Sequence, residues 1–304
     1  MDRLNTGRRQ FLKQAAILTT AAAVSALPGC GNLTVSRRHF DISLAQWSLH
    51  RRFFSGEANP DEFATITRDE FDIGGVEYVN QFYKDRLSDA LINTLKTRAD
   101  NAGVRSLLMM IDGEGAIGAA SEAQRQQTVD NHKKWADAAR QLGCHSIRVN
   151  AQSEGSYDEQ RERAADGLVK LAEYCDPLGL NVIVENHGGL SSNARWLSQV
   201  METAHHPRVG TLPDFGNFVI DRDTGESYDR YQGVRELMPY AKAVSAKSYA
   251  FNEQGQETSI DFPRMMDIVM ATGYSGWVGV EYEGEKHSEA EGIRLTRDLL
   301  RSLR

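Results

Sequence analysis

Short apolar runs alternate with amphipathic helical patterns along the chain from about Asp41 onward. Each run has the length of one strand, and the segment after it repeats its apolar positions with the helical period. Eight runs predict strands, at residues 42–48, 75–79, 104–111, 145–150, 180–185, 209–214, 243–247 and 277–282. Because strands that alternate with helices pair in parallel, we expect one parallel sheet.

Helical segments fill the spaces between these runs. They include residues 87–101, 122–142, 159–174, 194–204, 228–237, 262–271 and 288–303. Gly103, Gly143, Gly179 and Gly273 follow predicted helices, where glycine commonly ends a helix in the left-handed conformation. Eight strand–helix units fill an α/β barrel, so we predict a single-domain (β/α)8 TIM barrel over residues 41–304. The competing open, doubly wound sheet would need a G-x-G-x-x-G phosphate-binding motif, which this sequence lacks.

The first 30 residues have the layout of an export signal. An arginine pair, Arg8-Arg9, stands before Phe11-Leu12-Lys13 and an apolar, alanine-rich run at residues 15–27. This order resembles a twin-arginine (Tat) signal peptide, which is removed after export. We therefore expect the Tat machinery as a partner and a periplasmic location, with residues 31–40 as a short tether to the barrel.

The end of this segment, Leu27-Pro28-Gly29-Cys30, resembles a bacterial lipobox. In a lipobox the cysteine is lipidated and becomes the mature N-terminus, so the protein would meet the membrane only through Cys30. Ordinary cleavage after Ala26 is the alternative, because Val24-Ser25-Ala26 ends in small residues. Beyond this segment no apolar run is long and charge-free enough to predict a membrane span.

Composition disfavours two classes of protein. The formal net charge of −7 argues against a nucleic-acid partner, since nucleic-acid-binding domains usually carry a basic surface. The three cysteines, Cys30, Cys144 and Cys175, are too few for a disulfide scaffold and match no zinc motif. We expect Cys144 and Cys175 to be buried free thiols, although an oxidising compartment allows a bridge between them.

Polar side chains gather where the predicted strands end. Alternation along the last strand places Val278 and Val280 on one face, and Gly279 and Glu281 on the face toward the barrel axis. The same alternation points further polar side chains inward: Glu77, Arg148, Asn150, Glu185, His187, Asp214, Ser245 and Lys247. Most of them lie at C-terminal strand ends, which form the catalytic face of barrel enzymes.

Glu185, Asp214 and Glu281 are three carboxylates expected to converge on one barrel mouth. An unpaired buried carboxylate is costly, so a positive charge must lie among them. A divalent cation is one candidate, and Lys247 together with Arg148 is the other. A structural salt-bridge network is a third interpretation, but it explains one such carboxylate better than three on adjacent strands.

Five motifs resemble the xylose-isomerase-like barrel superfamily, whose members are often called sugar phosphate isomerase/epimerases. They are Gly74-Gly75-Val76-Glu77, Ala138-Ala139-Arg140-Gln141-Leu142-Gly143, Val184-Glu185-Asn186-His187-Gly188-Gly189, Pro213-Asp214-Phe215-Gly216-Asn217 and Gly279-Val280-Glu281-Tyr282. The resemblance covers essentially the whole predicted barrel and implies a divalent metal on Glu185, Asp214 and Glu281. It also implies a histidine ligand on the seventh strand, where this chain has Ser245.

Ser245 changes which ion the implied site prefers. A serine hydroxyl is a weak metal ligand, and an all-oxygen site favours manganese or magnesium over zinc, with cobalt also open. His187, on the same face as Glu185, is an alternative source of a nitrogen ligand. The remaining alternative is a site without a metal, in which Lys247 is the central cation.

The resemblance also implies a chemistry. In the family, the metal polarises a sugar carbonyl while a glutamate removes the proton from the neighbouring carbon. Glu185 and Glu281 would then serve as base and acid, with Lys247 as the third catalytic residue. Contacts with the substrate are expected from Glu77, Arg148, Asn150, His187, Asn217 and Lys247.

We therefore expect a metal-assisted isomerase or epimerase that acts on an unphosphorylated sugar or sugar derivative in the cell envelope, since phosphorylated sugars are mainly cytoplasmic. A 3-keto-glycoside lyase or hydrolase, which eliminates a group from the same enediolate, is the first alternative. The non-enzymatic alternative is a carbohydrate-binding lipoprotein on a disabled barrel, because the ligand histidine is missing. The family's DNA-repair branch fits poorly with export and with the acidic composition.

Overall fold

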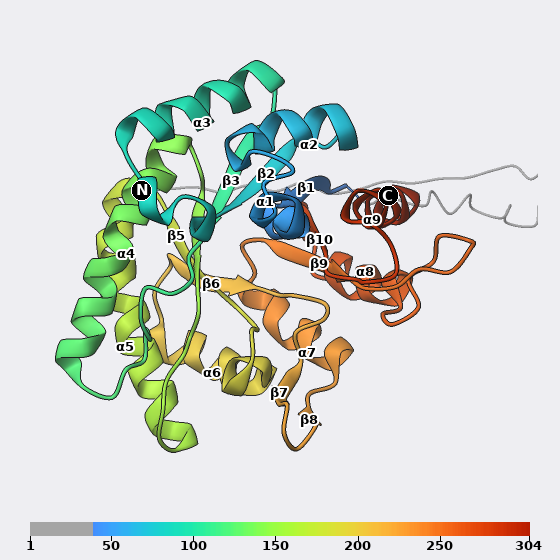
Figure 1. Ribbon diagram of the computed structural model, residues 1–304. Coiled ribbons are helices and arrows are strands. Elements are labelled where there is room, and N and C mark those ends of the chain that lie inside the picture. Colours follow the sequence, from blue (N-terminus) through green and yellow to red (C-terminus); the bar gives the residue numbers. More distant parts are fainter. Residues whose placement is uncertain (1–38) are drawn as a thin grey trace, which may run out of the picture. The chain divides into compact units, whose positions relative to one another are not determined.

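Parallel strands form one eight-stranded sheet within residues 39–304, the part of the chain that the computed structural model describes (Figure 1). The strands are β1 (Asp41–Ala45), β2 (Gly75–Val79), β3 (Arg105–Met110), β4 (Ser146–Val149), β5 (Asn181–Glu185), β6 (Val209–Leu212), β9 (Val244–Ser248) and β10 (Trp277–Tyr282). Their order is β6-β5-β4-β3-β2-β1-β10-β9, and neighbouring strands run parallel. The predicted (β/α)8 barrel is confirmed.

The sheet closes between its two outer strands, β6 and β9. Ser245 N donates to Pro213 O at 2.9 Å, and Phe215 N donates to Ser245 O at 3.1 Å. A parallel bridge thereby pairs Asp214 with Ser245. The closure brings a carboxylate from one edge of the sheet next to a hydroxyl from the other edge.

Helices surround the strands (Figure 1). In chain order they are α1 (His50–Phe54), α2 (Phe63–Phe71), α3 (Asp89–Ala102), α4 (Glu122–Leu142), α5 (Tyr157–Cys175), α6 (Ala194–Ala204), α7 (Arg230–Leu237), α8 (Phe262–Met270) and α9 (Glu289–Ser302). The bounds of α4 and α6 are those predicted, and the other predicted helices differ by one or two residues at either end. The short helices α1 and α2 were not predicted.

Local signals fix where the helices begin and end. Ser121 caps the start of α4 by accepting a hydrogen bond from Gln124 N. Gly143 follows the same helix with a φ of 83°, as expected for a left-handed C-cap. The other predicted glycines, Gly103, Gly179 and Gly273, also have positive φ.

The first strand is shorter than predicted. It ends at Ala45, because Gln46–Leu49 form a 3-10 helix. Beyond Ala45 the side chain of Gln46 continues the contact with β2. Its Oε1 accepts from Val79 N at 2.9 Å, and its Nε2 donates to Tyr83 Oη at 2.7 Å. The turn leaves Trp47 at the barrel mouth instead of in the strand.

The apolar core lies between the strands and the helices. Val278 and Val280 of β10 are fully buried in it, as are Trp135 of α4 and Trp196 of α6. Polar side chains such as Glu77 are buried inside the barrel instead, where Glu77 lies against Gly279. The predicted division of faces along the last strand therefore holds.

Two smaller features complete the described chain. A hairpin of β7 (Val219–Asp221) and β8 (Glu226–Ser227) extends the connection between β6 and α7.

Cys144 and Cys175 are both buried and unbridged, as expected.

The predictions for the N-terminus concern another part of the sequence. Arg8-Arg9, Ala26 and Cys30, together with residues 31–38 of the predicted tether, lie outside the described residues. Among the helices of residues 39–304, none combines the length and the apolar character needed to cross a bilayer.

Candidate active site

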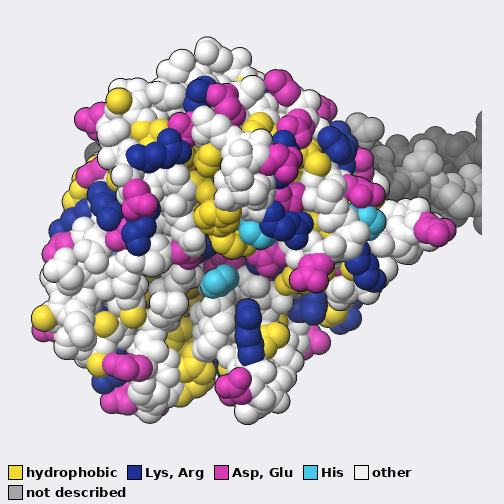
Figure 2. Space-filling view, in the orientation of Figure 1, with side chains coloured by type: hydrophobic (Ala, Val, Ile, Leu, Met, Phe, Trp, Pro, Cys, Tyr) yellow, Lys and Arg dark blue, Asp and Glu magenta, His cyan; other side chains and the backbone are white. Residues whose placement is uncertain are grey.

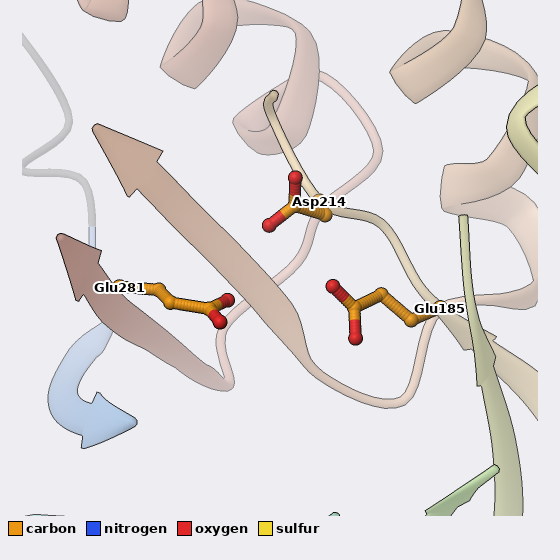
Figure 3. A group of neighbouring side chains, drawn as sticks. All are labelled: Glu185, Asp214 and Glu281. Atoms are coloured by element: carbon orange, nitrogen blue, oxygen red, sulfur yellow. The ribbon is translucent and has the colours of Figure 1, made fainter. Parts of the chain in front are cut away.

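Three predicted carboxylates meet at the C-terminal end of the barrel strands (Figure 3). Glu185 ends β5, Asp214 follows β6 and Glu281 lies on β10. One oxygen from each carboxylate lies within 4.8 Å of the others, and all three side chains are buried. Within residues 39–304, no other group of His, Cys, Asp and Glu side chains has this geometry.

The loop after β6 holds the Asp214 carboxylate in place. Gly216 N and Asn217 N each donate to Asp214 Oδ1 at 2.8 Å. Asn186, which follows β5, accepts from Asp214 N at 2.7 Å and donates to Asp214 O at 3.0 Å. A side chain at Gly216 would not fit, because a Cβ there would lie 2.4 Å from Tyr249 Oη. Because its two hydrogen bonds hold the Asp214 backbone, Asn186 is a positioning residue, which the sequence alone did not reveal.

Ser245, at the position where the resemblance implies a histidine ligand, contacts two carboxylates. Its hydroxyl lies 2.7 Å from Asp214 Oδ2 and 2.8 Å from Glu281 Oε2. A hydroxyl has one proton and can donate to one carboxylate at a time. His187, the alternative nitrogen donor, is not a member of the carboxylate group, and its side chain is exposed.

Lys247 places an ammonium group beside the carboxylates from the barrel wall. Only 2% of its side chain is exposed, and its Nζ lies 3.6 Å from Glu281 Oε1 and 3.9 Å from Asp214 Oδ2. Glu283 Oε2, at 3.4 Å, is a further acidic neighbour. Burial alone would lower the pKa of Lys247, but these carboxylates raise it well above its ordinary value. Lys247 is therefore a permanent cation.

Arg148 supplies the second cation, on the side of Glu185. Its Nε lies 3.0 Å from Glu185 Oε2, and its Nη1 donates to Asp112 Oδ1 at 2.6 Å. Asn150 Nδ2 also donates to Asp112 Oδ1, at 2.7 Å. Burial would raise the pKa of Asp112, but Arg148 outweighs it and lowers this pKa to about 2. Arg148 is therefore shared between two carboxylates.

These cations do not balance the carboxylate group. Burial, opposed by Arg148, raises the pKa of Glu185 to about 7. Burial, opposed by Lys247, raises the pKa of Asp214 to about 7 as well. A divalent cation would keep both carboxylates ionised. The donors are hard oxygens, which magnesium and manganese prefer, so the residues fit such an ion.

Glu77 lies deeper in the barrel than the predicted substrate contacts. Its side chain is buried, Ser43 Oγ donates to its Oε1 at 2.6 Å, and its Oε2 has no hydrogen-bond partner among the described residues. Burial raises its pKa to about 8, so it is a neutral carboxylic acid at pH 7. It does not line the cavity at the mouth, and its contact with a substrate stays a prediction.

A cavity of about 360 Å³ opens at this barrel mouth, and Glu281 is the member of the carboxylate group that lines it. Figure 2 shows a hollow on this face, with histidine and acidic side chains around it. The predicted substrate contacts Arg148, Asn150, His187, Asn217 and Lys247 all line this mouth cavity, as does Glu281. Asn217 also donates to Glu185 Oε1 at 2.9 Å, which connects the cavity wall to the carboxylate group.

Five polar side chains that line the mouth cavity were not predicted: Gln81, Asp112, Gln152, Arg222 and Glu283. Glu283 follows β10 directly and Asp112 lies two residues after the end of β3, so their position after a barrel strand was the available signal. Gln152 lies in a loop and Arg222 follows the β7 strand of the hairpin, where no periodic pattern marks a side chain. Arg222 has no ion pair or hydrogen bond within residues 39–304.

An aromatic cluster packs around Trp47, the aromatic residue that lines the mouth cavity. Trp47 stacks on His50 with ring centroids 4.7 Å apart and contacts the Phe54 ring edge-on at 6.0 Å. Phe82 lies 6.3 Å from Trp47 on its buried side. The cluster fixes the orientation of Trp47, which lines the cavity and offers an apolar face to a bound ring.

Comparisons with known proteins agree with the fold. The family model described as xylose isomerase-like TIM barrel matches residues 69–303. The 3-keto-D-glucoside 4-epimerase of E. coli is similar, with a TM-score of 0.68 and 17% identity over 88% of this chain and 100% of that one. L-ribulose 3-epimerase has a TM-score of 0.66 and 17% identity, over 87% of this chain and 94% of that one.

A xylose isomerase-like TIM barrel protein from Mycobacterium smegmatis, in complex with magnesium, has a TM-score of 0.65 and 14% identity. That comparison covers 87% of this chain and 96% of the other. At these identities the likenesses establish the fold alone. No curated protein sequence matches this chain significantly.

Proposed function

The chain belongs to the xylose isomerase-like TIM barrel family, and from that premise we propose that it is an isomerase- or epimerase-type enzyme acting on an unphosphorylated sugar. The reaction begins with removal of a proton from the carbon next to a sugar carbonyl. The observation that carries the proposal is the buried group of Glu185, Asp214 and Glu281, with Lys247 and Arg148 beside it under an open cavity.

Glu185, Asp214 and Glu281 are the residues that would hold a divalent cation. Such an ion, when bound, polarises the carbonyl and so makes the neighbouring proton more acidic. The all-oxygen donor set, with Ser245 in place of a histidine, favours manganese or magnesium. The complex of the M. smegmatis relative with magnesium supports an ion of this kind.

Glu281 is the base that we assign to proton removal, because it lines the mouth cavity. The electron pair of the broken C–H bond forms a C=C bond, and the carbonyl oxygen takes the negative charge of an enediolate. Lys247, 3.6 Å from Glu281 Oε1, stays positively charged and stabilises negative charge at this place. We assign the return of a proton to Glu185, the carboxylate that Asn217 Nδ2 connects to the cavity wall at 2.9 Å. Return to the opposite face gives an epimer, and return to the other carbon gives an isomer.

The charge balance of the mouth cavity supports an unphosphorylated substrate. A phosphate group is usually bound by several cations or backbone donors. Lys247 and Arg148 already neutralise carboxylates, which leaves Arg222 as the unpaired cation among the described lining residues. The side chains of Asn150, His187 and Asn217 instead offer uncharged groups that match sugar hydroxyls.

A cell-envelope location remains part of the proposal. The Tat-like signal at Arg8-Arg9 and the lipobox-like Cys30 support export and a lipid anchor. Cys30→Ala should then move the protein from the membrane fraction to the soluble periplasmic fraction. If the variant fractionates as the wild type does, Cys30 is not the anchor.

Elimination from a 3-keto-glycoside is the second candidate. The fold resembles that of a 3-keto-D-glucoside 4-epimerase, and the same base would remove a proton next to the keto group. If the glycosidic oxygen lies β to the carbonyl, the enediolate electrons can expel it and leave an unsaturated sugar. The two outcomes share their first step and differ in their products.

Proton exchange with solvent tests the shared first step. The protein is incubated with manganese and candidate ketoses or 3-keto-glycosides in deuterium oxide, and NMR follows deuterium at the carbon beside the carbonyl. We expect exchange with wild type, its loss with Glu281→Gln, and no effect of Glu285→Gln, which changes an exposed glutamate in the loop after β10. Sugars that bind without exchange would instead support the carbohydrate-binding lipoprotein.

A further inference from the structure

A second cavity, of about 310 Å³, lies directly beside the mouth cavity. It is formed by the loops after β4 and β5, residues 151–153 and 187–191, and by Gln160 of α5. Gln152 and His187 line both cavities, so the two are neighbouring compartments of one cleft. We propose that the second cavity binds a second, neutral sugar ring, so that the substrate is a disaccharide or a similar glycoside. The inference rests on the proposed function for the ring that reacts above the carboxylates.

The sizes of the compartments support a substrate of two units. Pockets that enclose a drug-sized ligand span roughly 300–1,000 Å³. Volumes of about 310 and 360 Å³ lie at the lower end of that range. Each compartment therefore suits one ring, and a single ring over the carboxylates leaves the second compartment to water.

The chemistry of the second cavity indicates a neutral, hydroxyl-rich unit. Its polar lining consists of amide, hydroxyl and imidazole groups from Gln152, Ser153, Gln160, His187 and Ser191. Among the described residues, no Asp, Glu, Lys, Arg or aromatic ring other than His187 lines it. A phosphate or carboxylate would find no strong cation there, and an aromatic aglycone would find little to stack on. Amides and hydroxyls both donate and accept, as sugar hydroxyls require.

The loop after β5 has an open backbone surface and is fixed by hydrogen bonds of its own. Gly188 and Gly189 have φ of 82° and 57°, and a Cβ at either position would meet no atom within 4 Å. The bare backbone therefore faces open space that a ligand can approach closely. Ser191 holds the loop by accepting from His187 N at 3.0 Å and donating to Gly188 O at 2.7 Å. A loop fixed in advance loses little entropy on binding.

Binding measurements separate the second compartment from the chemistry. Calorimetry would give Kd values for methyl glucosides and for cellobiose, maltose and trehalose with the full-length protein. We expect at least one disaccharide to bind tenfold or more tightly than the methyl glucosides. Gln160→Trp should reduce this ratio to about one, because the indole fills the second compartment. Gln126→Trp is the matched control on α4, since Gln126 is exposed and lines neither cavity.

A crystal structure with the preferred disaccharide gives a second readout that does not depend on the variant folding. Density for one ring between the loops after β4 and β5 supports the inference. Three results would overturn it. The methyl glucosides and all disaccharides could bind equally tightly, or Gln160→Trp could weaken both ligand types by the same factor. The third such result is density that places the second ring against Trp47. Disaccharide binding of the expected kind, together with no proton exchange in any of the ketoses and 3-keto-glycosides, would sink the proposed enzyme function and leave the second ring site standing.

Discussion

Glu77→Gln removes an ionisable group from the barrel interior while keeping its shape. The Glu77 side chain is buried, and Ser43 Oγ donates to its Oε1 at 2.6 Å. Glutamine keeps the acceptor for Ser43 and places an amide nitrogen where the protonated oxygen lies. Because Glu77 is uncharged near pH 6, we expect the variant to have nearly the stability of the wild type there.

The two proteins should diverge as the pH rises. Burial raises the pKa of Glu77 from 4.5 to about 8 in the folded protein. The folded state therefore holds this proton more tightly than the unfolded chain, so stability falls as pH rises toward 8. At about 1.4 kcal/mol for each pH unit below the folded-state pKa, and half that slope at the pKa itself, the wild type loses about 2 kcal/mol of unfolding free energy between pH 6 and pH 8 through this group. Glu185 and Asp214 add the same trend to both proteins.

Urea unfolding at pH 6, 7 and 8, with a chelator present, measures the difference. The stability of Glu77→Gln relative to the wild type should rise by about 2 kcal/mol over this range. Glu285→Gln, at an exposed position, is the matched control and should show a flat difference. A flat difference for Glu77→Gln as well would refute the reasoning, because Glu77 would then be ionised across the whole range.

Three further results are expected. Ser245→His should shift ion preference toward zinc by adding a nitrogen donor, whereas Ser245→Ala should keep the preference for manganese; competition titrations that rank the ions alike in all three proteins would contradict this. Manganese affinity should rise with pH through about 7, since the ion must displace protons from Glu185 and Asp214, whose pKa values burial raises, and an affinity independent of pH in calorimetry would exclude that competition. Arg8→Lys with Arg9→Lys should hold the protein in the cytoplasm, and normal delivery of this double variant to the envelope would show that no Tat signal is present.

Most of the fold could be predicted because its signals are local. The alternation in β10 gave the inward face of Glu281, and the cap at Gly143 gave the end of α4. The turn at Gln46 could not be predicted, since it depends on a carboxamide that meets Val79 N only after two strands have paired. The prediction for the first strand, residues 42–48, therefore extends beyond its observed end at Ala45.

The candidate site was predictable where function coincides with a strand end. Glu185 and Lys247 lie on strands whose period points them inward. Asn186 and Arg222 escaped prediction for opposite reasons: Asn186 acts by holding the loop of another strand, and Arg222 lies in a hairpin with no period. The two contacts of Ser245 follow from barrel closure, which no local pattern encodes.

The central claim is that Glu185, Asp214 and Glu281 form a cation-binding centre for proton transfer. Anomalous scattering from a crystal grown with manganese tests it most directly. The account predicts one anomalous peak enclosed by these three carboxylates, and its loss in Glu185→Gln. A map with no peak there, and with the Lys247 ammonium in direct contact with Asp214 and Glu281, would contradict the account and make Lys247 the organising charge of the site.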